Sequence, residues 1–63
     1  MIITNLQEGD KLQYVDKDGV LRKGIVLRNR TTLSEPPRLF LTVQDEYERV
    51  EVIRDSKKVV SIQ

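Results

Sequence analysis

The chain consists of short β-type runs, each ended by a turn signal, and this rhythm constrains its fold more than any other feature. The runs cover residues 11–15, 20–28, 39–44, 47–53 and 58–62. Short runs rich in Val and Ile, with Gly, Pro and Asp between them, are typical of small barrels and sandwiches. No stretch shows a sustained 3.6-residue apolar period, so we expect no long helix. The sequence therefore predicts an all-β fold.

The breaks between the runs indicate how the strands are connected. Asp18-Gly19 predicts a hairpin turn because glycine accepts the positive φ that such turns require. The longest break spans residues 29–38, where Pro36-Pro37 excludes a central strand because proline cannot donate to a ladder. We expect a tight turn at residues 45–46, and a polar connection with one 3₁₀ turn at 54–57. This order of hairpin, long loop, hairpin, short break and last strand is that of a five-stranded SH3-like barrel.

The expected core follows from the alternation of strand side chains. In the second run Ile25, Val26 and Leu27 are consecutive, so both faces of that strand carry apolar side chains. If Val26 faces the core, Ile25 and Leu27 lie on the outer face. The expected core residues are Leu12, Tyr14, Val26, Leu39, Leu41, Val43, Val50, Val52, Val60 and Ile62.

With 63 residues the chain has room for one domain, 1–63, in which residues 1–7 form a possible N-terminal extension. It contains no Cys and no His, so we expect no disulfide, no metal site and no cofactor. Its stability must come from tight packing or from self-association. No apolar run reaches the length of a membrane span, and the N-terminus lacks the pattern of a signal peptide. We therefore expect a cytoplasmic protein without membrane contact.

The opening third of the chain, residues 8–28, contains three short motifs: Gly9-Asp10-Lys11-Leu12, Asp18-Gly19 and Lys23-Gly24-Ile25-Val26. With these motifs it resembles a KOW-type or Tudor-type SH3-like barrel. KOW-type domains occur in ribosomal proteins and transcription elongation factors, so the resemblance implies contact with RNA or polymerase. It also implies structural roles for Gly19 and Gly24, and phosphate contact for Lys23. The rhythm is similar to Sm-like and retroviral-integrase C-terminal domains too, although the N-terminal helix and first motif of Sm-like proteins are missing.

Catalysis is not expected. Without His and Cys, the chain lacks the commonest general base and the most reactive nucleophile. The serines lie in no nucleophile motif, and no glycine-rich phosphate loop is present. A small barrel also has no deep pocket in which to shift the pKa of a carboxylate or to hold a small-molecule substrate. We interpret the chain as a binding module rather than an enzyme.

Positive charge is concentrated in the middle of the chain. Residues 22–38 carry five basic side chains and one acidic side chain, a net of +4, whereas the whole chain carries +1. Four of the five are arginines, which pair with phosphates in a bidentate way. The segment thus predicts binding of a nucleic-acid backbone, RNA or DNA; the alternative is a solvated face paired with neighbouring acids. The predicted phosphate-binding residues are Arg22, Lys23, Arg28, Arg30 and Arg38.

The second hypothesis is a protein-interaction or self-assembling subunit. Ile25 and Leu27 on the outer face, together with Phe40, would form the contact with a partner or a second copy, because an exposed apolar patch on a small domain marks such surfaces. Alternatively, the apolar residues at positions 2, 3 and 6 fold back over that face. Only three aromatic residues are present, which argues against a proline-rich-peptide groove or a methyl-lysine cage.

Overall fold

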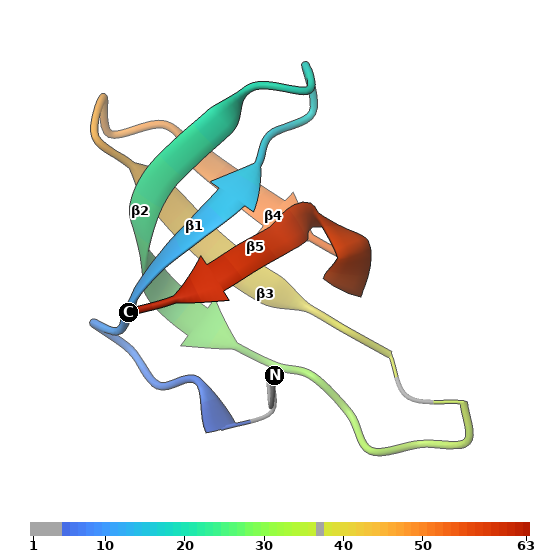
Figure 1. Cartoon of the computed structure of the whole chain (residues 1–63). Helices are drawn as coiled ribbons and strands as arrows, with labels where there is room; N and C mark the ends of the chain where they lie inside the picture. The colour runs from blue at the N-terminus through green and yellow to red at the C-terminus, as the bar shows by residue number, and fades with distance from the viewer. Residues whose placement is uncertain (1–4, 37) are drawn as a thin grey trace.

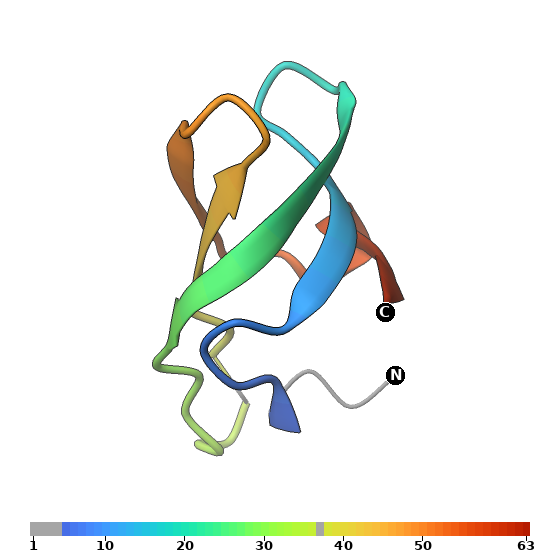
Figure 2. The ribbon, with the colours of Figure 1, turned by 90° about the vertical axis from the view of Figure 1, so that its left-hand side faces the viewer.

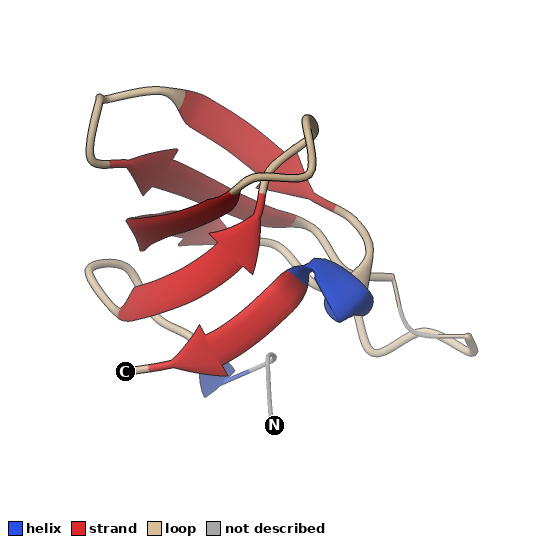
Figure 3. Ribbon diagram, turned by 45° about the horizontal axis from the view of Figure 1, so that its top comes forward, coloured by secondary structure: helices blue, strands red, loops and turns tan. Residues whose placement is uncertain are grey.

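A computed structural model describes residues 5–36 and 38–63 of the chain, and it confirms the all-β fold. Its five strands follow one another along the chain, with one 3₁₀ turn, η2, between the last two (Figures 1 and 3). The strand runs predicted from the sequence all form: the first matches β1 at both ends, and no end of the other four is displaced by more than three residues. The elements are β1 (Lys11–Val15), β2 (Leu21–Asn29), β3 (Leu41–Asp45), β4 (Val50–Ile53), η2 (Ser56–Lys58) and β5 (Val59–Ile62).

The five strands form one antiparallel sheet in the order β4-β3-β2-β1-β5. The long central strand β2 pairs with both β1 and β3, and β4 and β5 are the two edges. A bulge at Leu27 interrupts the β2–β3 pairing, and a second bulge interrupts β1–β5. Bulges increase the local twist of a sheet, and the sheet curls around its inner face (Figure 1). No helix among the described residues has the length and apolar character needed to cross a membrane.

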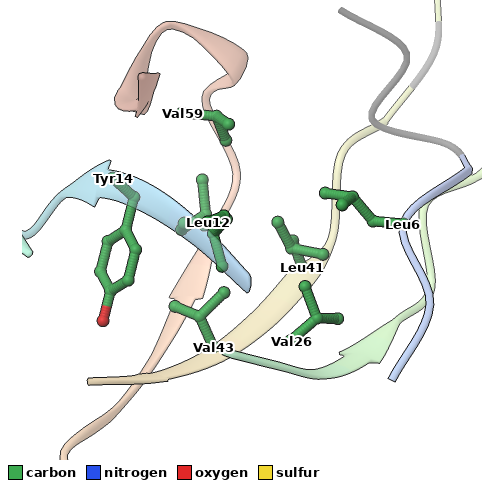
Figure 4. Packing of buried hydrophobic residues seen from close by; sticks show 8 residues of the cluster. Leu6, Leu12, Tyr14, Val26, Leu41, Val43 and Val59 are labelled. Atoms are coloured by element: carbon green, nitrogen blue, oxygen red, sulfur yellow. The ribbon is translucent and has the colours of Figure 1, made fainter. Parts of the chain in front are cut away.

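Buried side chains from all five strands and from the N-terminal segment meet on the inner face of the sheet (Figure 4). Tyr14 is 1% exposed and is the largest of them. Leu39 packs against this cluster while staying partly exposed. Six of the ten expected core residues are therefore in or against the core, and Leu6, Ile53 and Val59 join them. The buried cluster comprises Leu6, Leu12, Tyr14, Val26, Leu41, Val43, Ile53 and Val59.

The prediction that Val50 and Val52 are buried is wrong, because these side chains are 58% and 42% exposed. The turn before β4 extends to residue 49, and the pairing of Leu41 with Ile53 then sets the register of the strand. Paired residues in an antiparallel sheet point to the same face, and a shift of one residue reverses every side chain. Ile53 therefore joins Leu41 inside, and the two valines lie on the outer face.

The prediction that Val60 and Ile62 are buried is also wrong, since they are 48% and 37% exposed. The bulge in the β1–β5 pairing explains the difference. Gln13 pairs with Ser61 and Tyr14 pairs with Val59, so Val60 is the extra residue between them. Val59 consequently takes the inward position beside Tyr14, and Ile62 lies at the open end of an edge strand.

Gly24 marks the place where three strands approach most closely. It pairs with Leu12 on β1 and with Asp45 on β3. A Cβ atom at this position would overlap the carbonyl oxygen of Gln44 and would lie 3.0 Å from the Tyr14 ring. Only glycine fits here without displacing a neighbouring strand, so the structure requires it for packing rather than for positive φ.

Candidate functional site

The two ends of the molecule differ in charge. The turns between β1 and β2 and between β3 and β4 lie at one end, and the long loop from residue 30 to 40 lies at the other (Figure 2). The two turns contain five acidic side chains, Asp16, Asp18, Asp45, Glu46 and Glu48, and two basic ones, Lys17 and Arg49. The loop contributes Arg30 and Arg38 against Glu35. Arg54 lies at the same end because it follows Ile53, the partner of Leu41 at the start of β3.

A groove of about 490 Å³ opens at the loop end. Three of its lining residues are arginines, and none of the described lining residues is acidic. All three arginines are exposed, so their guanidinium groups are available to a ligand. Guanidinium groups present several N–H donors in a planar fork that matches phosphate or carboxylate oxygens. The described lining residues are Arg30, Thr32, Arg38, Leu39, Phe40 and Arg54.

Backbone hydrogen bonds hold the loop as an extension of the β2–β3 hairpin. The Arg30 N–H donates to the Phe40 carbonyl over 2.8 Å. Thr32 and Arg38 form an isolated bridge in which each N–H donates to the other's carbonyl, at 2.9 and 3.2 Å. The Asn29 side chain donates to the Leu6 carbonyl and accepts from the Thr31 N–H, which closes the base of the loop. Arg30 and Arg38 are thus carried on paired backbone rather than on an unsupported loop.

Phe40 lies half-buried in the groove beneath an arginine. The Cζ atom of Arg54 is 5.2 Å from the centre of the Phe40 ring, within the range of a cation–π contact. The sequence predicts a protein interface for Phe40 and a polar connection around Arg54, and it does not predict Arg54 as a site residue. The signal for Arg54 is the strand register: the pairing of Leu41 with Ile53 brings it beside the residue that precedes Leu41.

The other three predicted phosphate-binding residues lie outside this groove. Arg28 is exposed on β2 beside Thr42. Lys23 lines a shallow hollow whose described residues include Asp45, Glu46 and Glu48. The structure therefore brings together Arg30 and Arg38 and leaves Arg28, Lys23 and Arg22 apart from them.

Arg22 is held by an acidic partner. Its Nε donates to Asp16 Oδ2 over 3.0 Å, and its Cζ lies 5.7 Å from the centre of the Tyr47 ring. The Val20 N–H and then the Arg22 guanidinium, both donating to Asp16, lower the pKa of that carboxyl below its ordinary value. The bond to Asp16 also raises the pKa of Arg22. The alternative prediction for the basic segment, a solvated face paired with neighbouring acids, therefore describes Arg22.

The predicted protein-interface residues are divided as well. Ile25 is 37% exposed and Leu27 is half-buried at the bulge, whereas Phe40 lies in the groove at the loop end. Leu6 does not cover the outer face, because it packs into the core near Leu41 and Val26 (Figure 4). The predicted cover by Ile2 and Ile3 lies outside the described residues.

Among the described residues, no group of three or more acidic side chains is placed to hold a metal ion. The arginine groove is thus the site with the clearest chemistry, and it suits an anionic ligand. In comparisons with known proteins, no family model matches this chain, and no curated protein or solved structure is significantly similar to it.

Proposed function

We propose that the chain is a non-enzymatic binding module that holds a nucleic-acid backbone in the groove of Arg30, Arg38 and Arg54. The observation that carries this proposal is the convergence of three exposed arginines on one groove with no described acidic lining residue. Phosphate contacts by arginine supply most of the affinity of nucleic-acid binding and depend strongly on salt. Thr32 adds a hydroxyl of the kind that also contacts phosphates.

The charge separation of the molecule supports a defined orientation on the ligand. The acidic turns lie at the end opposite to the groove, so they repel phosphates from that end while the loop end attracts them. Phe40 is the one aromatic side chain in the groove, and Arg54 lies over its ring. With a single partly covered ring, binding rests on the backbone phosphates rather than on a row of stacked bases.

The fold that we infer for this module is an SH3-like barrel. The inference rests on the strand order β4-β3-β2-β1-β5, on the long β2, and on the 3₁₀ turn that leads into β5. Small antiparallel folds of this kind host many functions, so the strand order does not by itself specify a ligand. The choice of nucleic acid comes from the groove.

The proposal is tested by fluorescence anisotropy with labelled single-stranded RNA, single-stranded DNA and duplex DNA, at low and at moderate salt. The wild-type chain should bind at least one of them, with an affinity that falls steeply as salt rises. The double variant Arg30→Ala/Arg38→Ala should bind about tenfold or more weakly, and its salt slope should fall by about 2. Circular dichroism should show the same fold for both proteins.

The matched control is the double variant Lys11→Ala/Lys23→Ala, which removes the same charge from the outer face of β1 and β2. Its affinity should fall by much less than that of the groove variant. Equal losses in the two variants would mean that binding follows net charge, and the groove would not be the site. Absence of binding to all three nucleic acids at low salt would contradict the proposed function itself.

A protein-interaction role is the second candidate, and the exposed outer face favours it. Ile25 and Val50 both flank Gln44 in the sheet, and Val52 lies beside Thr42 in the next row. The three apolar side chains are 37%, 58% and 42% exposed. If this face binds a second copy, light scattering should show an oligomer that persists at high salt and dissociates in the double variant Val50→Ser/Val52→Ser. A monomer at millimolar concentration would contradict self-association.

A further inference from the structure

A hollow of about 210 Å³ lies between the two hairpin turns, at the end of the molecule opposite to the arginine groove. Residues of both turns and of the adjoining strands line it. Four of these residues are acidic and two are basic, so the hollow is negative overall. The lining residues are Tyr14, Asp16, Lys17, Asp18, Asp45, Arg49, Val50 and Glu51.

The Tyr14 hydroxyl faces this hollow and has no hydrogen-bond partner among the described residues. Tyr14 is 1% exposed, and its phenol ring extends away from the aliphatic side chains of the core (Figure 4). Its hydroxyl makes no hydrogen bond with any described residue. Every fully enclosed side-chain nitrogen or oxygen atom of the described residues, in contrast, has a hydrogen-bond partner. The hydroxyl oxygen is therefore not enclosed, and the hollow that Tyr14 lines is the space it reaches.

Burial, followed by the carboxylates of Asp45, Glu51 and Asp16, raises the pKa of Tyr14 to about 12. The hydroxyl therefore stays protonated at neutral pH and lies in a negative potential. A cation that donates a hydrogen bond to this buried hydroxyl would satisfy it and would also be attracted by the surrounding carboxylates.

Two carboxylates of the hollow have bonding capacity left. Asp45 accepts the Tyr47 and Arg49 N–H groups on Oδ1, at 2.8 and 2.9 Å. Glu51 accepts the Lys17 N–H on Oε1, at 3.1 Å. Among the described residues, the second oxygen of each carboxylate accepts no hydrogen bond. Together with the Tyr14 hydroxyl, these oxygens supply three acceptors.

Among the described residues, no cation forms a salt bridge with either of these two carboxylates, although Asp45 interacts with the charge of Arg22 at longer range. The ion pair between Arg22 and Asp16 is the one salt bridge formed within the described residues. Arg49 lies over the Tyr47 ring, with its Cζ 5.7 Å from the ring centre. Lys17 lines the hollow and is exposed to solvent. Asp45 and Glu51 are thus available to a cation from outside the chain.

We propose that this hollow binds a primary ammonium group, namely that of a lysine side chain of a partner protein. An ammonium has three N–H donors and no acceptor, which matches the three acceptors of the hollow. The volume suits the end of one such side chain rather than a larger ligand. A trimethylated lysine has no N–H donor and needs an aromatic cage, whereas Tyr14 is the one aromatic residue that lines this hollow.

The test is a titration of the ¹⁵N-labelled chain, followed by NMR, with a short capped peptide that holds one lysine between glycines. The same peptide with an acetylated lysine and the free diamine 1,5-diaminopentane are titrated in parallel. The lysine peptide should shift the amide signals of residues 14–18 and 45–51, and the acetylated peptide should shift none of them. Binding of the diamine without the peptide would overturn the assignment to a protein partner.

Two variants test the acceptors, and a third is the control. Tyr14→Phe removes the hydroxyl alone, and Glu51→Gln removes one charge while it keeps an acceptor for Lys17. Each should weaken peptide binding about tenfold, because each removes one charge-assisted contact. Glu46→Gln is the control, because Glu46 is exposed in the β3–β4 turn next to Asp45 but does not line this hollow. Equal weakening by all three variants, or no shift at millimolar peptide, would overturn the proposal.

Discussion

The β1–β2 turn, residues 16–20, and the β3–β4 turn, residues 45–49, have the same hydrogen-bond pattern. Each begins with an aspartate whose N–H donates to the carbonyl of the fifth residue and whose carbonyl accepts from the fourth. In each turn the aspartate Oδ1 accepts the N–H groups of the third and fifth residues, at 2.8 to 2.9 Å. Aspartate side chains stabilise turns in this way by replacing a backbone acceptor.

The two turns differ at the fourth position and in the surroundings of the aspartate. Gly19 has φ of 80°, and Glu48 has φ of 65°, although a side chain makes this conformation unfavourable. Asp16 is 9% exposed and forms an ion pair with Arg22, whereas Asp45 is half-buried and lines two hollows. The first turn thus has a glycine at the position of positive φ and an ion-paired aspartate, whereas the second turn has neither.

The largest effect is expected for a change in the strand that supports both turns. Gly24→Ala places a Cβ against the Gln44 carbonyl oxygen, next to Asp45, and against Tyr14 on the other side. Overlap of this kind in a packed region costs about 3 kcal/mol in the free energy of unfolding. Urea denaturation measures it, with Lys23→Ala on the exposed side of the same strand as the control. A loss below about 0.5 kcal/mol would show that the strands separate easily at this point.

The next comparison removes the aspartate from each turn. Asp45→Ala should lower the free energy of unfolding by about 1 kcal/mol, because it leaves two N–H groups without their side-chain acceptor. Asp16→Ala should lower it further, because the variant also leaves Arg22 without its ion-pair partner. Urea denaturation of both variants gives the two values. Equal values would mean that the Arg22 contact adds nothing to the first turn.

The pH dependence of stability isolates the Asp16 carboxylate. The folded chain holds the pKa of Asp16 below its ordinary value of 3.8. A lowered pKa in the folded state stabilises the fold above the unfolded-state pKa, and this contribution is lost as pH falls through the folded pKa. The stability difference between wild type and Asp16→Asn should therefore be constant near neutral pH and should shrink below pH 3.8. A difference that stays constant into strong acid would contradict the ion-paired arrangement.

Exchanging the fourth residues of the turns should give effects no larger than that of Asp45→Ala, and the smallest for Glu48→Gly. Glu48→Gly should raise the free energy of unfolding by about 0.5 kcal/mol, because glycine accepts positive φ but loses more entropy on folding. Gly19→Glu should lower it by about 1 kcal/mol for the converse reason. Thermal unfolding followed by circular dichroism measures both changes. Shifts of the same sign would show that the two turns do not share one backbone conformation.

The same two turns show what the sequence could and could not predict. The pair Asp18-Gly19 predicts the β1–β2 turn, because a glycine that can adopt positive φ is a local signal in the sequence. The sequence predicts the second turn at residues 45–46, whereas the turn extends to 49, because Glu48 gives no local sign of positive φ. The shorter turn implies a different register for β4 and thus predicts Val50 and Val52 in the core, although they are exposed.

The candidate site was predictable in part, for a related reason. The charge order along the chain indicated residues 22–38, and Arg30 and Arg38 from this segment do meet in the groove. The pairing of Arg22 with Asp16 and the approach of Arg54 to Phe40 depend on contacts between strands. Strand register decides these contacts, and in a hairpin the length of the turn fixes the register. The positive φ of Glu48, which lengthens the second turn, has no local sign in the sequence.

The most direct test of the arginine groove is to locate the bound nucleic acid on the molecule. The ¹⁵N-labelled chain is titrated with the oligonucleotide that binds best in the anisotropy assay, and its amide signals are followed by NMR. The groove predicts that shifts are concentrated at residues 30–40 and at Arg54, and that residues 16–20 and 45–49 stay unchanged. Shifts concentrated at the two hairpin turns, or along the outer face of β2 at Lys23 and Ile25, would contradict it.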